Sequence, residues 1–124
     1  TIDPELYCFT VRVPVMFGHL EAVWLDLEQD VEVEDIIKDW ADFKNVPDLP
    51  STAAQPVEYG ADPTFPQPKY AFWGNPSGMV VYTGRLKKKN GKIGFLLMVN
   101  NIVKGAAGGS IQNAEAFVKK FGLI

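Results

Sequence analysis

The sequence is poor in the residues that covalent and metal chemistry most often use. Its 124 residues include one cysteine, Cys8, and one histidine, His19. A lone cysteine cannot form an internal disulfide, so we expect a reducing compartment, the cytoplasm. No group of histidine, cysteine and carboxylate residues has metal-ligand spacing, and no metal site is predicted. Cys8 has aromatic neighbours, and we interpret it as a small core residue rather than a nucleophile.

Excess positive charge and long hydrophobic runs are also absent. The net charge is -3, which argues against a nucleic-acid partner, because phosphate binding requires a basic patch. No stretch approaches the ~20 apolar residues of a membrane span, and the N-terminus does not resemble a signal peptide, so no membrane partner is expected. A hydrophobic fraction of 47% and a charged fraction of 22% are typical of a globular protein. The length predicts a single domain over residues 1–124.

Four apolar segments predict strands: residues 6–13, 20–27, 79–86 and 93–99. The last two flank Asn90-Gly91, a sequence typical of a tight hairpin turn. The lysines around it are therefore interpreted as a solvated hairpin tip. Residues 93–99 are almost continuously apolar, which is typical of a central strand covered on both faces.

Two helices and one long loop complete the predicted fold. Asp30 is the expected N-cap of the first helix, whose apolar stripe is Val33, Ile36, Ile37, Trp40 and Phe43. The second helix follows residues 100–109, with the stripe Ile111, Ala114, Phe117, Val118 and Phe121. Residues 46–76 hold seven of the nine prolines together with several aromatics, which predicts an ordered loop without regular structure. The expected class is α+β, a mixed, largely antiparallel sheet with helices packed on one face.

Arg12 and His19 are the first candidates for chemistry. Arginine offers a planar fork that matches a carboxylate, and histidine can give and take a proton near neutral pH. An unbroken strand would put residues seven apart on opposite faces, but Pro14 and Gly18 interrupt it, so both side chains could face one pocket. The plainer interpretation is an exposed strand arginine and a hydrogen-bonded turn histidine. Residues 101–107 offer a similar choice between close helix packing and a ligand site at a helix N-terminus.

Four segments resemble motifs of bacterial aspartate-semialdehyde dehydrogenases. The family motifs are Arg-Val-Pro-Val…His-Ser-Glu, Tyr-Pro-x-Pro, Val-Gly-Arg and Asn-Leu-x-Lys-Gly-Ala-Ala…Val-Gln-Asn-Ala. They occur here in family order and span nearly the whole chain, which therefore resembles the C-terminal, catalytic and dimerisation portion of these enzymes. The matching segments are Val11-Arg12-Val13-Pro14-Val15 with Gly18-His19 and Glu21; Phe65-Pro66-Gln67-Pro68; Val81-Tyr82-Thr83-Gly84-Arg85-Leu86; and Asn101-Ile102-Val103-Lys104-Gly105-Ala106-Ala107 with Ile111-Gln112-Asn113-Ala114.

The resemblance implies a role for three residues. Arg12 matches the arginine that holds the substrate carboxylate, His19 the active-site acid/base, and Asn101 a residue that contacts the nicotinamide cofactor. The implied reaction is the NADP-dependent, reversible conversion of aspartyl phosphate to aspartate semialdehyde and phosphate, on the route to lysine, threonine and methionine. A homodimer or homotetramer is implied as well.

The chain departs from the family in several respects. The nucleophilic cysteine and the nucleotide-binding domain belong to an earlier segment, so we expect the chain alone to be inactive. Residues 101–124 are expected to supply the C-terminal helix that packs on that missing domain. Asn100 stands where an aspartate is common, and Leu20 where a hydroxyl residue is frequent. Two alternatives remain: a non-catalytic dimerisation module of this family, and N-acetyl-glutamyl-phosphate reductase, whose histidine region lacks the Arg-Val-Pro-Val lead.

Overall fold

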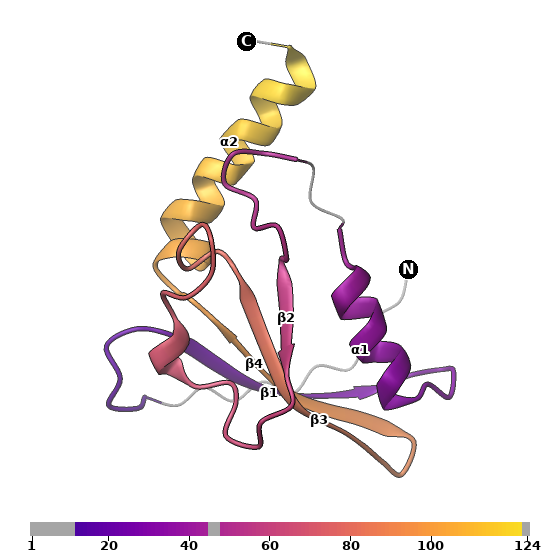
Figure 1. Cartoon of the computed structure of the whole chain (residues 1–124). Helices are drawn as coiled ribbons and strands as arrows, with labels where there is room; N and C mark the ends of the chain where they lie inside the picture. Colours follow the sequence, from indigo (N-terminus) through magenta and orange to yellow (C-terminus); the bar gives the residue numbers. More distant parts are fainter. Residues whose placement is uncertain (1–11, 45–47, 123–124) are drawn as a thin grey trace.

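A computed structural model of the chain describes residues 12–44 and 48–122. The strands are β1 (His19–Asp26), β2 (Val57–Gly60), β3 (Val81–Lys89) and β4 (Lys92–Val99). The helices are α1 (Val33–Asp42) and α2 (Gly108–Phe121), with a 3-10 turn at Pro68–Tyr70 and a π-helical turn at Val103–Ala107. Figure 1 shows α1 beside the sheet and α2 extending away from it. No helix in the described part of the chain is long and apolar enough to cross a membrane.

The strands form one mixed sheet in the order β1-β4-β3-β2. β4 is antiparallel to both β1 and β3, whereas β2 runs parallel to β3. At one end of the sheet His19 lies opposite Val99, and at the other Asp26 lies opposite Lys92. The expected fold class, a mixed and largely antiparallel sheet with helices, is therefore confirmed.

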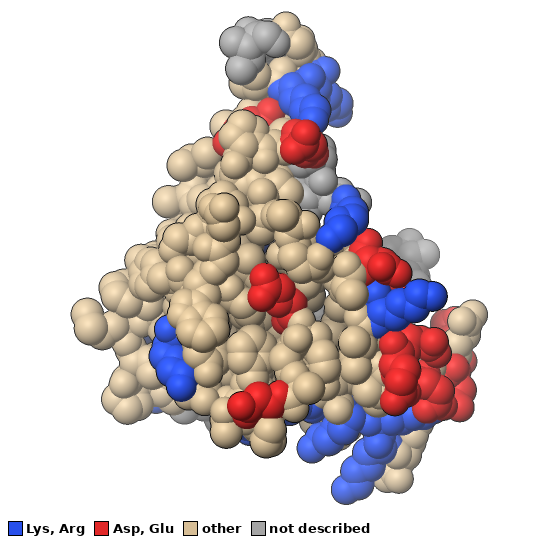
Figure 2. All heavy atoms as spheres, in the orientation of Figure 1, with Lys and Arg blue, Asp and Glu red and all other residues tan. Residues whose placement is uncertain are grey.

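The predicted hairpin joins β3 to β4 at Asn90-Gly91. Both residues have a positive φ, 53° and 75°, as a two-residue turn that follows the sheet twist requires. Near this end Lys88 forms ion pairs with Asp30 and Glu32, and Lys92 pairs with Asp26 at 2.8 Å. The hydrogen bonds within these ion pairs raise the pKa of Lys88 and of Lys92 above the usual lysine value. Figure 2 shows many of the charges on this side of the molecule around α1 and the hairpin, with fewer elsewhere.

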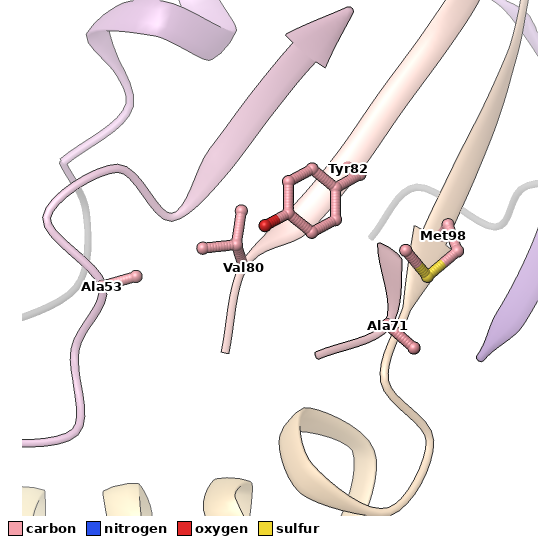
Figure 3. Packing of buried hydrophobic residues seen from close by; sticks show 5 residues of the cluster. All are labelled: Ala53, Ala71, Val80, Tyr82 and Met98. Atoms are coloured by element: carbon pink, nitrogen blue, oxygen red, sulfur yellow. The ribbon is translucent and has the colours of Figure 1, made fainter. Parts of the chain in front are cut away.

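One face of the sheet carries the main hydrophobic core. Tyr82 and Met98 are adjacent across β3 and β4, and they are buried together with Val80, Ala71 and Ala53 (Figure 3). Burial raises the pKa of Tyr82 to about 12, so its hydroxyl stays protonated at neutral pH.

The proline-rich segment is held on this core by Phe65. Its ring stacks on Tyr70 at a centroid distance of 5.2 Å and meets Tyr82 edge-on at 5.7 Å. A Cβ atom at Gly84 would lie 2.6 Å from the Phe65 carbonyl oxygen, so only glycine admits this approach. The described part of this predicted loop is therefore ordered and packs on the sheet.

The opposite face of the sheet carries α1. The indole of Trp40 lies 5.1 Å from the Phe95 ring and 6.1 Å from the Tyr59 ring. The half-buried Gln55 joins the end of this helix to β2. Its Nε2 atom lies 3.1 Å, 3.2 Å and 2.9 Å from the carbonyl oxygens of Trp40, Ala41 and Val57, respectively. The amide thus donates to two carbonyls at the end of the helix, of which that of Trp40 also accepts from the Phe43 N–H at 3.4 Å.

Replacing Gln55 with methionine should loosen α1. The change removes the Gln55 donor from these carbonyls, although that of Trp40 keeps the Phe43 N–H, and should cost about 1–2 kcal/mol of local stability. Hydrogen exchange followed by mass spectrometry should show faster exchange in α1 and β2. Gln67→Met is the matched control, since Gln67 donates to one exposed carbonyl, that of Thr64. Equal exchange in the two variants would contradict this role for Gln55.

Two predictions about residues 30–76 were wrong, and each has a physical reason. The segment from 46 to 76 is not free of regular structure, because Val57–Gly60 forms β2 along β3. The N-cap of α1 is Glu32 rather than Asp30, and Asp30 instead pairs with Lys88. The predicted strand at residues 6–13 lies outside the described residues except for Arg12 and Val13, which are not in a strand.

The C-terminal helix begins earlier than expected and leaves the sheet. Its π-helical turn starts at Val103, so residues 103–109 are helical rather than a loop. Residues 48–51 support α2: Ser51 Oγ donates to Glu115 at 2.6 Å, and Lys119 Nζ donates to the Asp48 carbonyl at 2.7 Å. The largest apolar side chains on α2 remain more than half exposed, namely Ile111, Phe117 and Phe121.

Candidate active site

A long-range hydrogen bond gathers the candidate residues at one end of the sheet. The backbone N–H of Gly18 donates to Asn101 Oδ1 at 3.0 Å, across 83 positions of sequence. Gly18 has a φ of +96°, a conformation that glycine adopts without strain. His19 follows it as the first residue of β1, and Asn101 comes two residues after β4 ends. This hydrogen bond therefore holds the backbone next to His19, the predicted acid/base, against Asn101, the predicted cofactor contact.

The loop at residues 65–68 meets the same turn. A Cβ atom at Gly18 would lie 3.0 Å from Pro68 Cα and 3.2 Å from the Pro68 carbonyl oxygen. The turn before His19 therefore packs directly on this loop, and a larger residue at 18 would push the two apart. Three of the four motif segments, those at 11–21, 65–68 and 101–107, meet here, while the fourth forms β3.

The His19 imidazole has one partner in the described part of the chain. Its Nε2 atom lies 3.0 Å from Glu21 Oε1, and the two side chains are 53% and 47% exposed. The residues are two apart on one strand, so they share a face of the sheet. Across β1 their neighbours on β4 are Val99 and Leu97, both apolar. The imidazole is accessible to a substrate and is oriented by a carboxylate.

Asn100 is a residue that sequence analysis noted only as a departure from the family. It is 1% exposed, and its Oδ1 accepts from the N–H groups of Ile102 and Val103 at 3.0 Å and 2.9 Å. Its Nδ2 donates to the Ala71 carbonyl at 2.8 Å. An aspartate could accept the first two bonds but could not donate the third. Asn100 therefore fixes the start of the C-terminal helix, and Asn101 with it.

Arg12 is exposed and lies outside regular structure. A tight turn follows it, in which the Val15 N–H donates to the Val13 carbonyl at 2.8 Å, and the described residues from Arg12 to Gly18 form no strand. No hydrogen bond or ion pair joins Arg12 to another described residue. Its convergence with His19 on one pocket stays a prediction.

An apolar hollow of 320 Å³ adjoins the turn, between residues 15–17 and 68–72. Phe17 and Phe72 meet edge to face across it at 5.1 Å. Met16 beside it is 87% exposed, which is unusual for a large apolar side chain. This surface is suited to a further protein segment or to the apolar part of a ligand.

The described residues bring an imidazole and a guanidinium to exposed positions, and they include no cysteine. Cys8 lies outside them, so the prediction that it is a core residue is not addressed. Among the residues that the structure describes, no group of three or more histidine, cysteine and carboxylate side chains could hold a metal ion.

A known protein family matches most of the chain. The model of the semialdehyde dehydrogenase dimerisation domain matches residues 3–104. The chain belongs to this family. Its sequence is 36% identical over 111 residues to an aspartate-semialdehyde dehydrogenase from Archaeoglobus fulgidus, covering 88% of the chain and 32% of that protein. It is 34% identical over 116 residues to malonyl CoA reductase (NADP) from Metallosphaera sedula, covering 90% and 32%.

Solved structures of this family share the fold. Aspartate-semialdehyde dehydrogenase with NADP from Candida albicans superposes with a TM-score of 0.74 at 24% identity, over 90% of the chain and 32% of that structure. Aspartate semialdehyde dehydrogenase II from Vibrio cholerae superposes with a TM-score of 0.67 at 24% identity, over 86% of the chain and 29% of that structure. The chain thus spans about a third of the length of the relatives that it matches.

Proposed function

We propose that this chain is the C-terminal portion of an NADP-dependent aspartate-semialdehyde dehydrogenase, with His19 as acid/base, Arg12 as substrate anchor and Asn101 as cofactor contact. The observation that carries the proposal is the bond from Gly18 to Asn101. It holds the acid/base and the cofactor contact at one end of the sheet, beside the loop at residues 65–68. Family membership of residues 3–104 supports the reaction class.

Each side chain has a task that its chemistry suits. His19 takes the proton of the attacking thiol, which the upstream domain supplies, and returns it as the intermediate collapses. Arg12 orients the substrate by binding its carboxylate in two parallel hydrogen bonds. The Asn101 oxygen is engaged by Gly18, so its amide N–H groups are the part that would face the cofactor. NADP, when bound, accepts the hydride.

Two further surfaces of the chain are expected to contact other parts of the assembled enzyme. In this proposal α2 packs its exposed stripe on the nucleotide-binding domain, as expected for residues 101–124, and residues 1–124 form one domain. More than half of the surface of Ile111, Phe117 and Phe121 would be covered there. The sheet and the apolar hollow between residues 15–17 and 68–72 would form the contact between subunits in a homodimer or homotetramer. This is in keeping with a dimerisation-domain family.

The activity of the full-length protein tests this proposal. It should reduce NADP in the presence of aspartate semialdehyde and phosphate, whereas the 124-residue chain alone should not. The absorbance of the reduced nicotinamide measures the reaction rate of the full-length protein and of the chain alone. An inactive full-length protein that still binds NADP would instead favour a non-catalytic dimerisation module.

Malonyl-CoA reduction is a second candidate. It is favoured by the 34% identity to malonyl CoA reductase (NADP), which is similar to the identity to the semialdehyde dehydrogenases. Both substrates end in a carboxylate that Arg12 could bind, and they differ in the group that leaves, phosphate or coenzyme A. Assays with malonyl-CoA and NADPH, beside those with semialdehyde and phosphate, separate the two activities.

Arg12→Lys should raise the KM of the full-length enzyme for its carboxylate substrate about tenfold. Lysine keeps the positive charge but loses the planar fork that binds two oxygens at once. The loss should be mainly in KM, with a smaller effect on kcat through misplaced substrate. Lys69→Arg, on the rim of the apolar hollow, is a charge-conserving control. An unchanged KM in Arg12→Lys would exclude Arg12 as the anchor.

A further inference from the structure

We propose that Glu21 is a positioning residue for His19, and that it makes Nδ1 the nitrogen that exchanges the proton. This inference rests on the proposed function and deepens it, because the family resemblance gives Glu21 no role. The observation is the 3.0 Å contact between Glu21 Oε1 and His19 Nε2. No other described residue bonds to the imidazole.

The contact determines where the imidazole carries its proton. An ionised carboxylate only accepts hydrogen bonds, so the nitrogen that faces it must carry hydrogen. A neutral imidazole has one N–H, and with that hydrogen on Nε2 the lone pair is on Nδ1. Nδ1 then accepts the proton of the thiol and later returns it, while Nε2 keeps its own throughout.

The backbone on both sides of the pair is fixed. His19 and Glu21 pair with Val99 and Leu97 of β4, and Gly18 is tethered to Asn101. The remaining freedom of His19 is the rotation of its side chain, and Glu21 restricts it. A half-exposed contact of this kind contributes little to stability, so this carboxylate acts on the orientation of the ring rather than on the fold.

The same strand offers a matched control. Asp26 also lies on β1 and forms an exposed ion pair, with Lys92 at 2.8 Å, at the opposite end of the sheet from His19. Loss of either carboxylate removes one surface contact, but only Glu21 touches the imidazole. A general effect of losing a carboxylate contact on β1 would appear in both variants.

The test compares Glu21→Ala, Glu21→Gln and Asp26→Ala in the full-length enzyme. Glu21→Ala should lower kcat about tenfold with little change in KM, because a displaced catalytic group costs up to ~10²-fold in rate. Glu21→Gln should restore most of the rate, since its amide oxygen still accepts from Nε2–H. Asp26→Ala should match wild type. An unchanged kcat in Glu21→Ala, or a loss confined to KM, would overturn the inference.

A double-mutant cycle shows whether Glu21 acts through His19. In a His19→Asn background the Glu21→Ala change should have no further effect on kcat, because its target is gone. A loss of the same size in both backgrounds would show a merely structural role and overturn the inference.

The ring nitrogens give a readout that needs no activity. Nitrogen-15 spectra of the neutral imidazole, assigned by the signal lost in His19→Asn, should show hydrogen on Nε2 in wild type and a mixture of both forms in Glu21→Ala. Identical spectra would overturn the inference. If the wild type turned over neither the semialdehyde nor malonyl-CoA, the proposed function would fail, and these spectra would still decide the role of Glu21.

Discussion

Replacing His19 with alanine should lower kcat of the full-length enzyme by about 10²- to 10⁴-fold, the usual contribution of a general acid–base group. Thiol attack and collapse of the intermediate both require a proton carrier that works near neutral pH. His19 is the only histidine in the chain and has a half-exposed ring. Steady-state kinetics with the semialdehyde, phosphate and NADP measures the effect, and KM should change little.

The fold of this variant should be intact. The tether to Asn101 uses the backbone N–H of Gly18 rather than the imidazole, so the turn keeps its anchor. Far-UV circular dichroism and the mass of the assembly should therefore match wild type. A kcat near wild type in a folded His19→Ala enzyme would show that the proton carrier is elsewhere.

Replacing Asn100 with leucine should destabilise the start of the C-terminal helix by about 3 kcal/mol. Leucine has a similar shape but satisfies none of the three backbone partners of Asn100, which are the N–H groups of Ile102 and Val103 and the Ala71 carbonyl. A buried group left without its partner costs about 1–3 kcal/mol. Amides of residues 102–107 should exchange up to ~10²-fold faster, as hydrogen exchange and mass spectrometry can show.

Two further variants make this prediction specific. Asn100→Asp keeps the acceptor for the helix N–H groups but loses the donor to Ala71, so its exchange should be intermediate. Asn113→Leu changes an exposed asparagine on α2 and should leave residues 102–107 unaffected. If all three variants behaved alike, the buried hydrogen bonds of Asn100 would not determine the stability of this junction.

The elements with strong local signals were predicted from sequence, and those that depend on distant partners were not. The apolar run at residues 93–99 and the Asn90-Gly91 turn are enough to predict β4 and its hairpin. β2 has only four residues among prolines, and its ladder is supplied by β3, so nothing local indicates it. Asp30 is a good N-cap by type, but Lys88 on the hairpin binds it instead.

In the candidate site, too, the residues could be predicted from local sequence, whereas their long-range contacts could not. His19, Arg12 and Asn101 came from matched motifs, yet no spacing rule predicts that Gly18 and Asn101 would touch across 83 positions. Glu21 belonged to a matched motif, and its contact with His19 could have been anticipated from the two-residue period of a strand. The importance of Asn100 depends on the Ala71 carbonyl, which only the folded chain brings near.

The length of β4 separates the site from the hairpin. The hairpin is therefore a suitable place to insert additional sequence. His19 lies opposite Val99, whereas Asn90-Gly91 is at the other end of the strand, roughly 25 Å away at the rise of an extended chain. Asn90 and Gly91 are exposed, and a Cβ atom at Gly91 would meet nothing within 4 Å. A purification tag, fluorophore or split-protein fragment inserted between them would extend into solvent and leave the His19 end of the sheet unaltered (Figure 1).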